Sequence, residues 1–85
     1  MFYKDKPDVE LLNIWNHDGS KKDTPYRKYI GHTGRLYYLP EKQRCGIFFY
    51  DLIKALALSK VQCAQEIEGR LIIMTLNSIY IFRLL

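Results

Sequence analysis

The sequence predicts an α+β domain, a small antiparallel sheet of four to five strands with one main helix packed on it. Three observations support this fold class. Residues 47–60 place apolar side chains at helical spacing, residues 71–75 and 79–84 are rich in β-branched and aromatic side chains, and Gly and Pro separate the apolar runs. At 85 residues we expect a single domain, 1–85. A small, strongly curved barrel-like sheet is the alternative.

The N-terminal half contains three candidate strands. Residues 9–15 alternate imperfectly between apolar and polar side chains and fit a strand or a short helix. Residues 16–20 form a turn, because Asn and Asp tolerate the left-handed backbone and Gly prefers it. Residues 26–30 and 35–39 favour strands, and residues 31–34 between them have the length and the glycines of a hairpin loop. We therefore expect these two strands to form a hairpin.

The main helix is expected over residues 47–60. Its second half is rich in the good helix formers Leu, Ala and Lys. Asp51 and Lys54 fall on the polar side, and we expect Leu52 and Leu56 to be buried. The apolar arc consists of Phe48, Phe49, Leu52, Ile53 and Leu56.

The C-terminal third is expected to be strands. Residues 61–66 form one candidate, and Gly69 marks a turn before the runs at 71–75 and 79–84. Both runs are apolar on both faces, so we expect the helix to cover one face. The other face then has to meet the N-terminal hairpin or a second chain, which predicts a homodimer.

The compartment follows from the termini and the cysteines. Residues 1–8 lack the apolar region of a signal peptide, and the apolar run 71–85 is shorter than the ~20 residues of a membrane helix. We therefore expect a soluble, cytoplasmic protein without a membrane partner. Cys45 and Cys63 are expected to be reduced and largely buried, with a disulfide between them as the alternative.

No catalytic set or cofactor site is recognisable, so we expect a protein that is not an enzyme and needs no cofactor. His17 and Asp18 lie in the expected turn, and His32 lies in the expected hairpin loop. A metal site formed by these loop histidines with Asp18 or Cys45 is the alternative, but isolated loop histidines are ordinary surface groups.

Positive charge is concentrated in the middle of the chain. The formal net charge of +4 divides into −2 for residues 1–20, +5 for residues 21–44 and +1 for the remainder. Cations alternate with tyrosines in the middle segment, which fits a solvated basic face, a protein-binding surface or a nucleic-acid-binding surface. Because exposed cations add little stability, we expect an Arg27, Arg35 and Arg44 to Ala variant to stay folded. The candidate partner-binding residues are Tyr26, Arg27, Lys28, Tyr29, Arg35, Tyr37, Lys42 and Arg44.

Residues 75–82 read T-L-N-S-I-Y-I-F. A T-x-N-S-x-Y hairpin followed by an apolar strand resembles the ending of small accessory proteins from phages and other mobile elements. The resemblance covers only this short segment and supplies no functional residues, and a purely structural hairpin is the other interpretation.

The small size, the Tyr- and Arg-rich segment and the lack of a catalytic set suit a protein that acts by occupying a surface. We therefore expect a non-enzymatic binding protein, a phage or mobile-element inhibitor of a host defence protein, like an anti-CRISPR protein. It would act on a host protein in the host cytoplasm. A small basic nucleic-acid-binding regulator is the alternative.

Overall fold

The computed structural model describes residues 8–39, 43–52 and 54–85, and these residues form one curved antiparallel sheet. The strand order is β4-β3-β2-β1-β7-β6-β5, and every pair in it is antiparallel. In chain order the elements are β1 (Asp8–Trp15), the short 3-10 helix η1 (Pro25–Tyr29), β2 (Thr33–Leu39), β3 (Arg44–Phe49), β4 (Lys54–Ala57), β5 (Val61–Ile67), β6 (Arg70–Thr75) and β7 (Ile79–Leu84).

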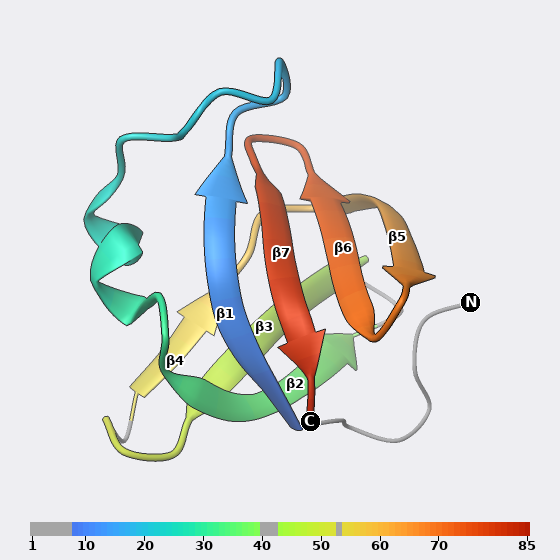
Figure 1. The fold of residues 1–85 in the computed structure, drawn as a ribbon. Coiled ribbons are helices and arrows are strands. Elements are labelled where there is room, and N and C mark those ends of the chain that lie inside the picture. The colour runs from blue at the N-terminus through green and yellow to red at the C-terminus, as the bar shows by residue number, and fades with distance from the viewer. Residues whose placement is uncertain (1–7, 40–42, 53) are drawn as a thin grey trace.

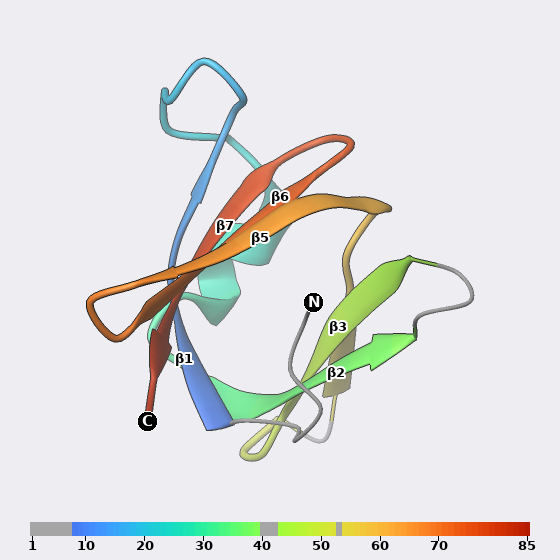
Figure 2. The ribbon, with the colours of Figure 1, turned by 90° about the vertical axis from the view of Figure 1, so that its right-hand side faces the viewer.

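The sheet curves into two layers that face each other. β1, β7, β6 and β5 form one layer, and β2, β3 and β4 lie behind it (Figures 1 and 2). The end strands β4 and β5 are consecutive in the chain and are joined by residues 58–60. The backbone N–H of Leu58 donates to the Cys45 carbonyl (2.8 Å), and that of Leu76 donates to the Lys60 carbonyl (2.9 Å). This connection therefore ties the two layers together.

The core fills the space between the two layers. Alternate side chains of the strands other than β5 point inward, as expected for a sheet with one buried face. In β5, residues 62–67 are all exposed. η1 lies beside β1, on the side away from β5 (Figure 1), and contributes its Tyr29 ring to the core. The buried cluster comprises Val9, Leu11, Ile14, Tyr29, Leu36, Cys45, Ile47, Phe49, Leu56, Leu58, Leu71, Ile73, Tyr80 and Phe82.

The prediction of an α+β fold with a main helix over residues 47–60 was wrong. The described residues of this segment form the end of β3, a turn and β4, and no helix covers the sheet. Ile47 and Phe49 are fully buried whereas Phe48 between them is exposed, which is the period of a strand. Leu56 is buried as expected, but Leu52 is exposed. Ile53 lies outside the described residues. The strongly curved sheet, the alternative fold, agrees with the structure.

The predicted hairpin over residues 26–38 was also wrong, because its first strand is η1. Pro25 occupies the first turn of η1, where its fixed φ and missing N–H are tolerated. Thr24 caps the helix by accepting from the Tyr26 N–H (3.4 Å). The second predicted strand lies within β2.

The remaining candidate strands are strands in the structure. The segment 9–15, for which a short helix was the other interpretation, is the strand β1, and the segment 61–66 lies within β5. The runs at 71–75 and 79–84 are β6 and β7, which pair with each other. Gly69 has a φ of 77°, which is the left-handed conformation that the turn before β6 requires.

The T-x-N-S-x-Y segment closes the turn between β6 and β7. Thr75 is fully buried, and its hydroxyl accepts from the Ser78 N–H (3.2 Å) and from the Ser59 hydroxyl (2.8 Å). Ser78 is buried as well. These contacts give the polar residues of the segment a structural role, as the second interpretation of the sequence held.

Two findings bear on the compartment. Cys45 is buried and Cys63 is exposed, and both are free thiols, so the expectation of two largely buried thiols was wrong for Cys63. Within residues 8–39, 43–52 and 54–85, no helix is both long enough and apolar enough to cross a membrane.

We expect Leu56→Ala to lower the free energy of unfolding by about 2–5 kcal/mol, because it opens a cavity between the layers. Leu56 is 4% exposed, whereas Leu52, four residues earlier, is 38% exposed. Leu52→Ala is therefore the matched control and should change stability by less than about 1 kcal/mol. Urea unfolding of the two variants measures the difference, and equal losses would contradict the assignment of Leu56 to β4.

The two thiols should react at different rates in the native protein. Burial raises the pKa of Cys45 to about 12, so its thiolate does not form near pH 8. Cys63 is exposed on β5 and accessible to reagent. Iodoacetamide should therefore alkylate Cys63 alone in the folded chain and both thiols in denaturant. Mass spectrometry of the alkylated peptides measures this, and native modification of Cys45 would contradict the packing of β3.

Candidate functional site

The structure divides the predicted partner-binding residues between two surfaces. Tyr26, Lys28 and Arg44 lie along a groove between η1 and β4. Arg35 and Tyr37 lie on another surface, formed by β2 and β3. Lys42, which was also predicted, lies outside the described residues. The basic segment is therefore not one continuous contact surface.

Arg27 has a structural role. Its guanidinium donates to the backbone carbonyls of Ile14 (2.9 Å) and Lys22 (3.0 Å) and to the Asn13 side-chain oxygen (3.0 Å). These bonds tie η1 and the loop before it to the end of β1. Arg27 is half-buried and directs its charge into the domain.

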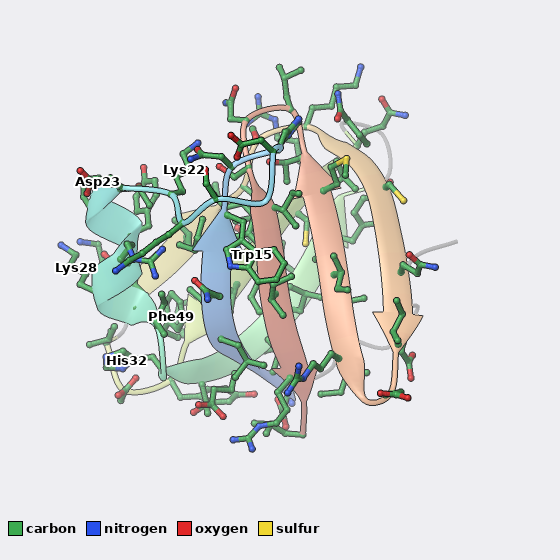
Figure 3. The ribbon with its side chains drawn as sticks, turned by 45° about the horizontal axis from the view of Figure 1, so that its top comes forward. Trp15, Lys22, Asp23, Lys28, His32 and Phe49 are labelled. Carbon is green, nitrogen blue, oxygen red and sulfur yellow. The ribbon has the colours of Figure 1, made fainter. Side chains whose placement is uncertain are left out.

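Tyr29 is a core residue that forms the floor of the groove. Its side chain is buried, and its ring stacks on Phe49 with the ring centres 5.0 Å apart. The Lys28 ammonium lies 5.3 Å from the Tyr29 ring centre, a cation–π contact that holds the lysine at the groove. Figure 3 shows Lys28, Phe49 and His32 gathered at this end of the molecule.

Arg35 and Tyr37 line a shallow hollow of about 280 Å³ together with Phe48 and Tyr50. Arg35 is paired with Asp8, 3.6 Å away, and the Tyr50 hydroxyl donates to the same carboxylate. This hydrogen bond and partial burial raise the pKa of Tyr50. The charge of Arg35 is thus partly neutralised by β1, which makes this surface less suited to an anionic partner.

The groove between η1 and β4 consists of three adjoining cavities of about 350, 370 and 290 Å³. The first two share Tyr26 and Ala57, and the second and third share Lys28, Tyr29 and Lys54. We call this the basic groove. Its described lining residues are Lys22, Thr24, Pro25, Tyr26, Lys28, Tyr29, His32, Arg44, Leu52, Lys54, Ala55, Leu56, Ala57, Leu58, Ser59, Asn77, Ser78 and Tyr80.

The basic groove is strongly positive. Four cations line it, Lys22, Lys28, Arg44 and Lys54, and its described lining contains no Asp or Glu. Asp23 follows Lys22 in sequence but is not part of the lining. A concave surface lined by one sign of charge concentrates the potential and attracts ligands of the opposite sign.

One end of the basic groove is held rigidly. The Lys22 ammonium donates to the Asn77 carbonyl and to the Ser78 hydroxyl, both at 2.7 Å. Tyr80 lies buried beside them, and burial raises the pKa of its phenol, which therefore stays neutral. An ammonium group has a third proton, so Lys22 keeps a donor for a ligand. Arg44 on the same cavity is exposed.

The wall formed by β4 is an open strand edge. β4 pairs with β3, and no other described strand lies on its second side. The bond from the Leu58 N–H to the Cys45 carbonyl fixes the alternation of the β3–β4 ladder. One and three residues before Leu58, the same alternation turns the backbone of Ala57 and Ala55 away from β3. Both residues line the basic groove.

Sequence reasoning missed three parts of this site, Lys22, Lys54 and the edge of β4. Lys22 was not among the predicted partner-binding residues, and Lys54 was assigned to the polar side of a helix. The excess of cations over residues 21–44 includes Lys22 and is the signal that could have identified it. No sequence pattern indicated the open edge of β4, because the segment that contains it was interpreted as a helix.

No metal centre is found in the described parts of the chain. Within these ranges no three His, Cys, Asp or Glu side chains are grouped so as to hold an ion. His17 contacts the Thr75 carbonyl (2.7 Å), and His32 contacts Asp51 (2.8 Å). The two histidines thus have separate structural contacts.

We expect Arg27→Ala to destabilise the domain by about 1.5–3 kcal/mol, because it leaves two carbonyls and an amide oxygen without their charged donor. This corrects the expectation that Arg27, Arg35 and Arg44 can be replaced together without loss of stability. Arg35→Ala is the matched control, since an exposed ion pair contributes at most about 1 kcal/mol. Thermal melts of both variants measure the difference. A melting temperature for Arg27→Ala equal to that of Arg35→Ala would contradict the structural role of Arg27.

Comparison of the chain with protein-family models, with curated proteins and with solved structures found no match in any of the three.

Proposed function

We propose that this chain is a non-enzymatic binding domain that holds an acidic, extended segment of a partner protein in the basic groove. The observation that carries the proposal is the combination of four cations with an open strand edge in one groove whose described lining has no acidic residue. Charge selects the partner, and the edge of β4 supplies backbone hydrogen bonds to it.

The mode of binding follows from the direction of the β4 backbone. An extended peptide that adds to an open strand edge gains main-chain hydrogen bonds, while the pockets beside the edge select its side chains. Ala55 and Ala57 would bond to the peptide backbone, and their small side chains leave space beside Tyr26 and Lys28. The groove is wide enough for this, because a cavity of about 370 Å³ separates η1 from β4.

The cavity at the Lys22 end would hold an acidic side chain of the peptide. The anchored Lys22 ammonium and the exposed Arg44 guanidinium both line it. A carboxylate is matched well by the planar fork of an arginine together with a lysine point charge. Lys28 and Lys54 lie further along the groove, so the peptide should carry acidic residues at more than one position.

A protein partner fits the groove better than a nucleic acid does. Binding of a single strand without base-specific contacts relies on exposed rings on which successive bases stack. Of the three tyrosines in the described lining, Tyr29 and Tyr80 are buried, and Tyr26, 45% exposed, is left for stacking. A nucleic-acid-binding regulator is therefore the less favoured alternative.

The biological role that we propose is inhibition. A domain that occupies an acidic segment of a host protein blocks the natural ligand of that segment, which suits an inhibitor encoded by a phage or another mobile element. This part of the proposal rests on the small size of the chain, the groove and the T-x-N-S-x-Y resemblance.

We expect the Arg44→Glu, Lys54→Glu variant to fold normally and to lose binding of acidic ligands. Both side chains are exposed, so their replacement changes stability little. A suitable probe is a labelled peptide that alternates glutamate with valine, titrated by fluorescence anisotropy. Loss of two charge contacts should weaken its affinity by about tenfold or more.

The matched control is the Lys60→Glu, Arg70→Glu variant. It makes the same change in net charge at two exposed cations outside the basic groove, and it should bind the peptide nearly as the native chain does. An oligothymidylate is titrated in parallel. Equal loss in both variants, or binding of the oligothymidylate alone, would contradict the proposal.

A further inference from the structure

The strand β5 forms the other open edge of the sheet. It pairs with β6, and no other described strand lies on its second side. Every residue from Gln62 to Ile67 is exposed, although β5 is among the longest strands of the described sheet. A long exposed edge is a template for pairing with another chain.

The composition of β5 gives little protection against such pairing. Natural edge strands are protected by lysines, prolines or inward-pointing charges. β5 contains no Lys, Arg or Pro, and its one charged residue is Glu66, the ladder partner of the buried Leu71. Its only irregularity is a bulge between Val61 and Cys63, which leaves residues 63–67 as a regular strand.

The turn after β5 shows which backbone groups point outward. Glu68 and Gly69 both have positive φ, at 51° and 77°, as in a two-residue hairpin turn whose flanking residues are hydrogen-bonded to each other. Ile67 therefore bonds to Arg70 of β6, its partner in the ladder. By alternation Gln65 and Cys63 also face β6, and Ala64 directs its N–H and C=O to the open edge.

The outer face next to this edge is apolar. Ile72 and Met74, both half-buried, alternate with core residues on β6 and so point away from the interior. Ile79 and Ile81 lie on the same face of β7 but are buried. Trp15 lies on the same face, 36% exposed and in front of β7 (Figure 3). Cys63 is the ladder partner of Met74, so β5 continues this face to the edge.

We propose that two copies of this chain pair through β5, antiparallel, about a two-fold axis at Gln65. The axis is placed at Gln65 because this residue is the midpoint of the regular segment 63–67. This dimer does not depend on the function proposed for the basic groove, since β4 and β5 are the opposite ends of the strand order.

The edge is self-complementary in this register. Gln65 faces Gln65 of the second copy, and two amides can bond to each other. Ile67, which is 44% exposed, faces Cys63 of the second copy and so gains an apolar neighbour beside Met74. Ala64 faces Glu66, so no like charges oppose each other. The second copy therefore covers the outermost part of the apolar outer face.

Light scattering tests the dimer. The native chain at tens of micromolar should have twice the mass of one chain. Gln65→Lys places two ammonium groups opposite each other on the axis and should reduce the mass to that of one chain, while the exposed site leaves the circular dichroism spectrum unchanged. Gln65→Ala is the control and should remain dimeric. A native chain of single mass, or a Gln65→Lys variant that stays dimeric, would overturn the proposal.

Disulfide formation tests the register, and it does so even if Gln65→Lys fails to fold. Non-hydrogen-bonded neighbours across an antiparallel ladder lie about 4.5 Å apart at Cα, within the range of a disulfide. Ile67→Cys should therefore cross-link to the native Cys63 of the second copy under mild oxidation. The same substitution in a Cys63→Ser background should not cross-link, since the two 67 positions are far from each other. Cross-linking of both variants, or of neither, would overturn the register.

Discussion

Closure of the two layers through residues 58–60 determines how this sheet buries its interior and where its open edges lie. A single strongly curved sheet can bury a continuous apolar interior only if its ends are joined, and the bonds of Leu58 to Cys45 and of Leu76 to Lys60 join them. Because the chain crosses from one layer to the other at this point, β4 pairs with β3 alone and β5 with β6 alone. The closure that completes the core thus also produces the two open edges.

The basic groove depends on a second packing arrangement, the position of η1. The stacking of Tyr29 on Phe49 holds η1 against the core, and the three hydrogen bonds of Arg27 hold the preceding loop against β1. Lys22 and Tyr26 reach the groove because these contacts fix the segment between β1 and β2. Arg27 therefore supports the groove without lining it, which explains why an arginine in a basic segment need not contact a partner.

The two C-terminal strands were predicted correctly because their pattern allows one interpretation. β6 and β7 are dense in β-branched and aromatic residues. Residues 9–15 fitted a strand or a short helix, and the structure decides for the strand β1. The segment 47–58 was ambiguous, because Ile47, Phe49, Leu56 and Leu58 fit an inward-facing set at a period of two, whereas an overlapping set fits an arc at a period of 3.6. That second set is Phe48, Phe49, Leu52, Ile53 and Leu56. Pairing of β3 with β2 decides between them, and that long-range contact has no local signal.

The candidate site was predictable in charge and not in geometry. The basic composition of residues 21–44 indicated the positive charge of the basic groove, which Tyr26, Lys28 and Arg44 line. Lys54 lines the same groove only because β4 lies opposite η1. Arg35 does not line the groove, because β2 directs its side chain to another face, next to Asp8. Contacts between segments far apart in the chain decided both outcomes.

The chemistry of the two open edges suits each to a different one of the two partners that we propose. Pairing of β4 with β4 of a second copy would bring two sets of cations together, since Lys28 and Lys54 lie beside this edge. The repulsion disfavours self-association there and leaves the edge free for an acidic segment. β5 carries no cation and is complementary to itself, so the same repulsion is absent. With the proposed pairing, a chain with two open edges would avoid open-ended assembly, because a two-fold pairing of β5 closes on itself whereas β4 would repel its own copy.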